Sequence, residues 1–339
     1  MVRQSLNIPG SCVETYLLRL YPVIRDTTSP AARVFQYTEL MPELPEVETI
    51  RRGLAQRVTG DVIESVWLSD KPEPFKSPPA GIATTLEGAR IAAVTRMGKH
   101  IVFDLEGGNR TTPPLGPRPA SRTRRRDAGA TTGAAAGATH SKSQWIVHLG
   151  MTGSLQVQRP HAELQKHTHA VVRLRSGREL RFVDPRRFGR MWVVHGGFQT
   201  HGAEPLDIGF ELFAGLFRKR KTPIKSALLN QKLLRGVGNI YADESLFRAG
   251  IRPRRRAGTL GRAELRRLYD SVQEVLTEAI AAGGSSISDY FNAEGEPGLF
   301  QTQHRVYGRG SEPCIVCGTP IKRIVIAARG THYCPKCQK

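Results

Sequence analysis

The chain has 339 residues, 39% of them hydrophobic, which is enough apolar material for two or three globular domains. Its 50 Lys and Arg outnumber 30 Asp and Glu, and the formal net charge of +20 suits a polyanionic partner such as nucleic acid or an acidic membrane surface. No apolar run approaches the roughly 18 residues of a membrane span, which argues against a membrane protein. A patch at residues 16–24 is interrupted by Arg19 and lacks a cleavage site, so the expected location is cytoplasmic.

Residues 1–40 carry no sustained hydrophobic period, and we expect them to be an N-terminal extension that is disordered or results from a misassigned start site. The folded chain is expected to begin at Met41. From Leu44 to Val58 apolar residues recur every three or four positions, which predicts an amphipathic helix. Acidic residues lie early in this helix and arginines later, in agreement with the helix dipole.

Short or alternating apolar runs follow and predict an antiparallel sandwich or barrel. We expect strands at residues 62–68, 91–94, 101–105, 145–149, 170–174, 180–183 and 191–194. Together with the first helix, they predict a catalytic β-sandwich domain over residues 41–200.

A long insertion, residues 107–143, separates two of these strands. It is rich in Gly, Pro, Ala, Thr and Arg and contains no Val, Ile, Phe, Tyr or Trp, so it cannot build a core and is predicted to be disordered. Its basic run at residues 122–126 is either a solvated charge cluster or an auxiliary DNA tether.

The hydrophobic period becomes helical from about Pro205, which predicts a second domain over residues 205–300. A helix at 224–234, a glycine turn at 236–238 and a helix at 239–249 would direct free amides and a positive dipole end at phosphate. A plain helical hairpin is the alternative. A long amphipathic helix over residues 260–280 should end at Gly283-Gly284.

Four of the five cysteines form two Cys-x2-Cys pairs, separated by 16 residues, within a predicted zinc ribbon at residues 305–339. This spacing is typical of one structural zinc ion with four thiolate ligands, and two disulfides are the alternative. The predicted ligands are Cys314, Cys317, Cys334 and Cys337.

Five separated segments together resemble the formamidopyrimidine-DNA glycosylase family in order and spacing. They are residues 41–49 (MPELPEVET), 148–154 (HLGMTGS), 184–189 (DPRRFG), 236–242 (GVGNIYA) and the zinc ribbon. The resemblance covers residues 41–339 apart from the insertion. It implies an α+β multidomain protein with an N-terminal β-sandwich and flanking helices, a helix-two-turn-helix domain and a C-terminal zinc ribbon. It also implies a monomeric base-excision repair glycosylase and AP lyase that removes oxidised purines from bent duplex DNA.

The resemblance assigns catalytic roles. Pro42 would be the nucleophile once Met41 is removed, because its nitrogen then becomes an amine with a pKa near ~8. Glu43 would protonate the sugar ring and Glu46 would support the same site. Lys99 would transfer a proton in β-elimination, and Arg329 would bind phosphate and act in δ-elimination. Taken alone, Glu43 could only complement a helix N-terminus, and Lys99 and Arg329 could be ordinary surface charges.

The resemblance also implies DNA contacts by His167, Arg186, Lys221 and Asn239, with Lys225 as a plausible further contact. Met151, Arg186 and Phe188 match the residues that fill the void left by the extruded base, and Arg186 has donors that can read the orphaned cytosine. Met151 and Phe188 could instead be core residues. The loop at 285–300 resembles the segment that closes over the flipped base.

Two rival interpretations remain. The sister group, endonuclease VIII, shares the proline nucleophile but prefers oxidised pyrimidines, and Leu44, Met151 and the Arg186/Phe188 pair argue against it. A catalytically silent DNA-binding protein on the same fold is the other rival, because Pro42 is an amide in any chain that keeps residues 1–40.

Overall fold

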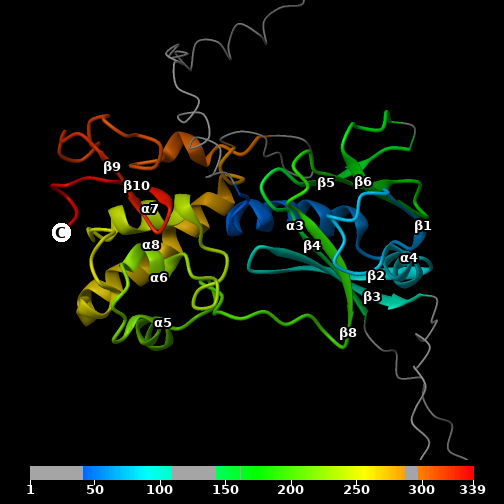
Figure 1. The fold of residues 1–339 in the computed structure, drawn as a ribbon, viewed down its shortest axis with the longest axis horizontal. Coiled ribbons are helices and arrows are strands. Elements are labelled where there is room, and N and C mark those ends of the chain that lie inside the picture. Colours follow the sequence, from blue (N-terminus) through cyan, green and yellow to red (C-terminus); the bar gives the residue numbers. More distant parts are fainter. Residues whose placement is uncertain (1–40, 109–142, 161, 287–296) are drawn as a thin grey trace, which may run out of the picture. The chain divides into compact units, whose positions relative to one another are not determined.

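The computed structural model describes residues 41–108, 143–160, 162–286 and 297–339 (Figure 1). The predictions for residues 1–40, for nearly all of the insertion with its basic run, and for most of the loop at 285–300 lie outside the described residues.

Helix α3 (Leu44–Val58) begins immediately after Glu43 and confirms the first predicted helix. The apolar residues that recur every three or four positions are buried almost completely, and this one-sided burial explains why their period predicted the helix. The helix packs against strand β2 of the sandwich and against helix α8 of the following domain. Its N-terminus therefore lies where two domains meet.

The sandwich consists of two four-stranded antiparallel sheets, in the order β1-β6-β7-β5 and β2-β3-β4-β8. Its strands are β1 (Ile63–Leu68), β2 (Ala89–Met97), β3 (His100–Gly107), β4 (Ser143–His148), β5 (Ser154–Gln158), β6 (Thr168–Leu174), β7 (Glu179–Val183) and β8 (Arg190–His195). Phe103 and Trp145 are register partners on β3 and β4 and stack at 4.5 Å within the core. All seven predicted strands are present, and the sequence analysis missed β5 and the short helix α4 (Pro79–Leu86).

The second domain is helical. It contains α5 (Phe210–Phe217), α6 (Ile224–Leu228), α7 (Asn239–Arg248), α8 (Arg262–Ala281) and the short 3-10 helices η1 (Ala257–Thr259) and η2 (Phe300–Gln303). The helix predicted to run to residue 234 ends early, because Asn230 accepts hydrogen bonds that close a turn. Its side chain accepts from the amide of Lys232 and its carbonyl from the amide of Leu233. The prediction of an uninterrupted helix was wrong here.

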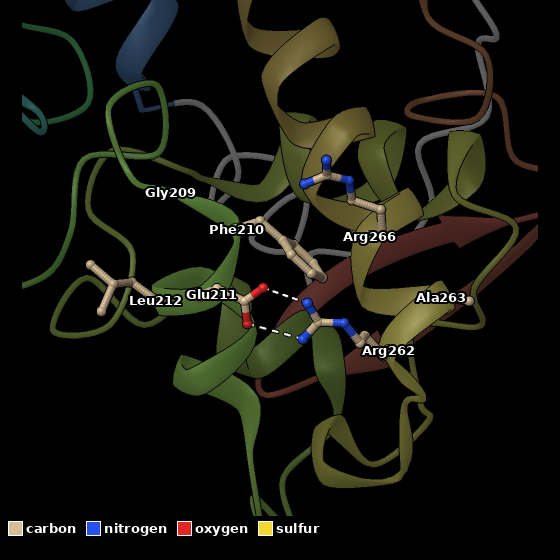
Figure 2. A pocket seen from close by; sticks show the side chains of 7 residues that line it. All are labelled: Gly209, Phe210, Glu211, Leu212, Arg262, Ala263 and Arg266. Carbon is tan, nitrogen blue, oxygen red and sulfur yellow. Dashed lines mark hydrogen bonds and ion pairs between the residues drawn. The ribbon is translucent and has the colours of Figure 1, made fainter.

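Helices α5 and α8 are joined at their N-terminal ends around a shallow pocket (Figure 2). The Glu211 carboxylate pairs with the Arg262 guanidinium, and the guanidinium groups of Arg262 and Arg266 lie 5.0 and 4.7 Å from the centre of the Phe210 ring. None of the residues predicted for the active site lines this pocket.

The C-terminal module contains the hairpin β9 (Lys322–Ile326) and β10 (Arg329–Tyr333) and its own small core around Phe247, Val306 and Ile321. Strand β10 packs against α7. The three parts confirm the predicted α+β fold class, while the exact domain limits at 200–205 and 300–305 stay predictions. In the described ranges, no helix is both long and apolar enough to cross a membrane.

Candidate active site

The start of α3 is fixed by its own third residue. Glu46 accepts a hydrogen bond from the Glu43 amide at 2.8 Å, which closes a capping interaction across the first turn. Pro42 precedes this turn and is only partly buried. The proline is therefore held beside two buried carboxylates at the junction of the two domains.

The Glu43 carboxylate lies at the N-terminus of α7, although almost 200 residues separate the two in sequence. The amides of Ile240 and Tyr241 donate to its two oxygens at 3.0 and 3.5 Å. A β-carbon on Gly238 would lie 2.2 Å from the Glu43 carboxyl carbon, so only glycine permits this approach. Two amides at the start of α7, which we predicted to be free to bind phosphate, thus bind a carboxylate of the candidate site instead.

Burial dominates the electrostatics of Glu43. Loss of hydration raises the pKa of the Glu43 carboxyl to about 7, against the opposing effect of the Lys99 charge and with a further increase from Glu46. The two amides of α7 act in the other direction but do not offset burial. Glu43 can therefore exist in both protonation states near neutral pH, as a general acid requires.

Glu46 connects the start of α3 with the start of the loop at 285–300. Its Oε1 accepts from the Ser285 amide at 2.8 Å and from the Tyr241 hydroxyl. The Ser285 hydroxyl lies 3.1 Å from Nε2 of His304 on the far side of the loop. Burial raises the pKa of the Glu46 carboxyl, and the hydrogen bond from Tyr241 opposes that increase. Glu46 is therefore buried in the site, where its carboxylate binds the Glu43 amide, the Tyr241 hydroxyl and the Ser285 amide.

Lys99 lies in the turn between β2 and β3, and a cluster of charges holds that turn. Glu204 accepts from the Gly98 amide at 2.6 Å, from Arg96 at 3.0 Å and from Arg235 at 2.9 Å. The turn of the sandwich is thereby fastened to the start of the helical domain. Sequence reasoning missed Glu204, because an isolated Glu resembles any surface acid.

Lys99 shares its electrostatic environment with both acids. Burial lowers the pKa of the Lys99 ammonium, Glu43 and Glu46 raise it, and Arg329 lowers it further. These mutual effects place Lys99, Glu43, Glu46 and Arg329 in one electrostatic neighbourhood. The structure therefore brings four of the residues to which the resemblance assigned roles close enough for their charges to interact.

The predicted void-filling residues lie on two loops that Asp184 joins. The buried Asp184 carboxylate accepts from the Thr152 hydroxyl at 2.6 Å, from the Arg186 amide at 3.2 Å and from the Gly189 amide at 2.7 Å. Its own carbonyl oxygen lies 3.0 Å from Nε2 of His169, within hydrogen-bonding distance. The two loops, which are more than 30 residues apart in the sequence, are thereby held side by side. We call this pair of loops, residues 150–153 and 184–189, the rim.

Gly150 makes this close approach possible. Its φ is +68°, and a β-carbon there would lie 2.4 Å from the Gly189 nitrogen. On the rim, Phe188 is 48% exposed and the Arg186 guanidinium lies 5.1 Å from the centre of its ring, while Met151 is partly buried. The alternative of Phe188 as a core residue is wrong, and an exposed aromatic side chain is suited to insertion between bases.

The other predicted DNA contacts occupy different surroundings. His167 and Lys221 are exposed, and His167 has a left-handed backbone with φ +81°. Asn239 is the first residue of α7 and is buried, with its side-chain amide donating to the Gly330 carbonyl at 3.0 Å. Their contacts with DNA stay predictions.

Lys225 requires a correction. We expected a DNA contact, but its side chain is completely buried and its ammonium forms an ion pair of 2.8 Å with Asp243, which is also fully buried. A buried, paired ammonium cannot reach a phosphate on the surface. The sequence prediction was wrong because a lysine beside a helix start is usually exposed.

The four predicted zinc ligands converge. Their sulfur atoms all lie within 4.8 Å of one another, with 3.9 Å between Cys314 and Cys337 and 3.5 Å between Cys317 and Cys334. Tetrahedral thiolates at ~2.3 Å from zinc are ~3.8 Å apart, whereas a disulfide needs ~2.05 Å. The sulfur positions fit zinc and exclude the disulfide alternative, so these cysteines form the site of one structural zinc ion.

Three family models match successive parts of the chain. Residues 41–191 match the formamidopyrimidine-DNA glycosylase N-terminal domain, and residues 202–290 match the H2TH domain of that enzyme. Residues 311–339 match a zinc finger found in FPG and IleRS.

Relatives and solved structures agree with these matches. Formamidopyrimidine-DNA glycosylases of Solibacter usitatus and Thermus thermophilus are 43% and 42% identical, over 88% of this chain and 100% and 98% of theirs. The crystal structure of MutM (Fpg) from Thermus thermophilus is similar with a TM-score of 0.70 and 40% identity, over 88% of this chain and 98% of that one. Lactococcus lactis Fpg in complex with DNA containing an abasic site is similar with a TM-score of 0.72 and 31% identity, over 88% and 99%. The chain therefore belongs to the formamidopyrimidine-DNA glycosylase family.

Proposed function

We propose that this base-excision repair DNA glycosylase and AP lyase removes oxidised purines from duplex DNA with the nitrogen of Pro42 as nucleophile. The observation that carries the proposal is the arrangement at the start of α3, where Pro42 adjoins a carboxyl group with a pKa of about 7. Lys99 and Arg329 share that electrostatic neighbourhood. A nucleophile, a proton donor and cationic groups are thus available at one place.

In the first step, the unprotonated Pro42 nitrogen attacks C1′ of the damaged nucleotide. The bond from C1′ to the base nitrogen breaks, the base leaves with its electron pair, and it takes up the proton that the Pro42 nitrogen loses after attack. Glu43 then protonates the ring oxygen, so the sugar opens and the freed electron pair on the Pro42 nitrogen forms a cationic iminium with C1′.

In the second step, the iminium accepts electrons from the adjacent carbon. Lys99, whose pKa is lowered by burial, takes the C2′ proton, and the 3′ phosphate leaves in β-elimination. In a second elimination the C4′ proton is lost and the 5′ phosphate leaves, with Arg329 binding this leaving group. Hydrolysis of the remaining iminium by water returns Pro42 as a free amine.

Duplex DNA is the partner, and solved relatives bound to damaged DNA support it. One is MutM in complex with DNA that contains carbocyclic 8-oxo-G, and another is Lactococcus lactis Fpg with an oxidised pyrimidine in the DNA. A monomer in the bacterial cytoplasm stays our prediction.

Incision of defined duplexes tests the function. We expect protein that begins at Pro42 to cut duplexes with 8-oxoguanine or formamidopyrimidine opposite cytosine faster than a duplex with an oxidised pyrimidine. Single-turnover rates on the three lesions give the comparison. Faster excision of the pyrimidine would favour the endonuclease VIII interpretation, and absence of excision on all three would favour a silent DNA-binding protein.

Arg186 is proposed to read the base left opposite the lesion. Its position on the rim beside Phe188 suits an insertion into the duplex, and its guanidinium can pair with the exposed cytosine. We expect Arg186→Ala to reduce the preference for cytosine over adenine by ~1–3 kcal/mol, the value of one good side-chain contact with a base. The measurement is the ratio of excision rates opposite the two bases. An unchanged ratio would remove Arg186 from this role.

The zinc module can be tested separately from the sandwich, because the two have independent cores. Cys334 is fully buried in the small core, so Cys334→Ser should abolish zinc binding and weaken DNA binding while the sandwich remains folded. Metal analysis, DNA titration and protection of the sandwich strands from hydrogen exchange provide the readouts. Full DNA affinity in a zinc-free variant would contradict the expectation.

A further inference from the structure

The buried ion pair between Lys225 and Asp243 is unexplained by the proposed mechanism. Both side chains are fully buried, one at the start of α6 and the other on α7, and their charged atoms lie 2.8 Å apart. A buried pair of this kind recovers its desolvation cost only with excellent geometry, and apolar residues of equal size often serve stability as well. The pair therefore calls for a role other than stability.

The acceptors around Lys225 point to that role. Besides Asp243, the ammonium donates to the Gly330 carbonyl and to the Thr331 hydroxyl, each at 2.9 Å. Both of these hydrogen-bond acceptors belong to β10, directly after Arg329.

A continuous chain of hydrogen bonds leads from the pair to Arg329 itself. The Thr331 hydroxyl, which accepts from Lys225, donates to the Arg329 carbonyl at 3.1 Å. Asp243 accepts from the His332 amide at 2.8 Å on the other side of this segment. The four residues from 329 to 332 are thus fixed by charged groups of the helical domain, in addition to the β-hairpin.

We propose that Lys225 and Asp243 are positioning residues that hold the tip of the zinc hairpin, and with it the backbone of Arg329, in place for the second elimination. This inference rests on the proposed role of Arg329 in the second elimination. The pair acts through Arg329 and does not touch DNA. Its loss should therefore affect the second elimination more than base release.

The test compares Lys225→Met, Arg329→Ala and the double variant on duplex DNA with 8-oxoguanine opposite cytosine, with protein that begins at Pro42 and contains zinc. Misplacement of a reacting group by about 1 Å can cost on the order of a hundred-fold in rate. We expect Lys225→Met to slow the second elimination roughly ten- to a hundred-fold while base release is unchanged. The same substitution at the exposed Lys71 of the sandwich is the matched control.

The double variant distinguishes a positioning role of Lys225, which acts through Arg329, from a contribution of Lys225 that is independent of Arg329. If Lys225 acts only through Arg329, the double variant should be no slower in the second elimination than Arg329→Ala alone. The proposal would be overturned if the rate losses of Lys225→Met and Arg329→Ala in the second elimination were additive in the double variant. It would also be overturned if Lys225→Met retained zinc and slowed base release as much as the second elimination.

Thr331→Val keeps the test decisive if Lys225→Met does not fold. This variant retains the ion pair and removes only the hydroxyl between Lys225 and the Arg329 carbonyl. We expect the second elimination to be slowed by a smaller factor than in Lys225→Met. An unchanged rate of the second elimination would overturn the proposal.

Hydrogen exchange provides a readout that does not depend on catalysis. The amides of residues 329–332 should lose protection in zinc-loaded Lys225→Met or Thr331→Val, while α7 keeps its protection. Unchanged protection at the hairpin would overturn the coupling. Absence of incision by the wild-type protein would instead contradict the proposed function.

Discussion

Protein that begins at Pro42 should form a covalent adduct with DNA when borohydride is present, and protein that retains residues 1–40 should not. The reason is the nitrogen: it is a secondary amine with a pKa near ~8 in the first protein and an amide in the second. An amide nitrogen has no available electron pair for attack at C1′. The substrate is a duplex with 8-oxoguanine opposite cytosine, and the adduct is measured by its reduced mobility on a denaturing gel.

Two controls sharpen this result. Pro42→Gly retains a primary amine at the same place and should trap weakly, so the extended chain is the more decisive comparison. Lys99→Ala should still trap, because Lys99 acts after the iminium has formed, but its strand cleavage should be slow. Efficient trapping by the extended chain would show that another amine is the nucleophile and would contradict the central assignment.

Local patterns account for the success of the sequence analysis on the fold. The stripe from Leu44 to Val58 predicted α3 because every apolar position of the stripe is buried, and the cysteine spacing predicted the zinc site because four thiolates are its ligands. Strand β5 was missed because its burial is incomplete and its sequence, SLQVQ, is short and polar. The end of α6 was missed because a turn at Asn230 overrides a continued apolar pattern.

The candidate site could be predicted only in part, because contacts between residues far apart in the sequence fix its geometry. Glu204 holds the Lys99 turn and Asp184 joins the two rim loops, yet neither has a local pattern that distinguishes it from a surface acid. Lys225 illustrates the opposite error. Its charge suggested a surface contact, whereas Asp243, 18 residues further along the chain, makes burial possible. Such pairings appear only once the helices are in place.

Glu43→Gln should make the protein more stable above neutral pH. A carboxyl whose pKa rises from 4.5 to about 7 on folding destabilises the folded state progressively as the pH increases from 4.5 to 7. The shift corresponds to about 3 kcal/mol in the free energy of unfolding, and Gln cannot ionise. The stability advantage of the variant should therefore grow over that interval and level off above it. Denaturant titrations of the full chain, where Pro42 has no titrating amine, measure it.

Glu48→Gln is the matched control for stability and should show the opposite sign. Burial opposes the ionised form of Glu48, but hydrogen bonds from Arg51 and Arg52 outweigh it and hold the pKa of that carboxyl below its usual range. Its contribution to stability is therefore present above the ordinary pKa and lost as the pH falls through the lowered value. The Glu48→Gln chain should be less stable than wild type at neutral pH, with a difference that shrinks in acid. The same pH trend in both variants would contradict the assignment of the Glu43 pKa.

The stability gained in Glu43→Gln should be accompanied by a loss of base release. A positioned general acid contributes about 10²- to 10⁴-fold, so excision of 8-oxoguanine by Glu43→Gln protein that begins at Pro42 should fall by roughly that factor. Wild-type excision should depend on pH in a bell-shaped curve with its maximum between about 7 and ~8, because the protonated Glu43 carboxyl is depleted above about 7 while the Pro42 amine becomes unprotonated only near ~8. On DNA that already lacks the base, the variant should still form the borohydride adduct, since the open-chain aldehyde of an abasic sugar needs no ring-opening proton. Loss of trapping on abasic DNA would show that Glu43 acts on the nucleophile rather than on the sugar ring.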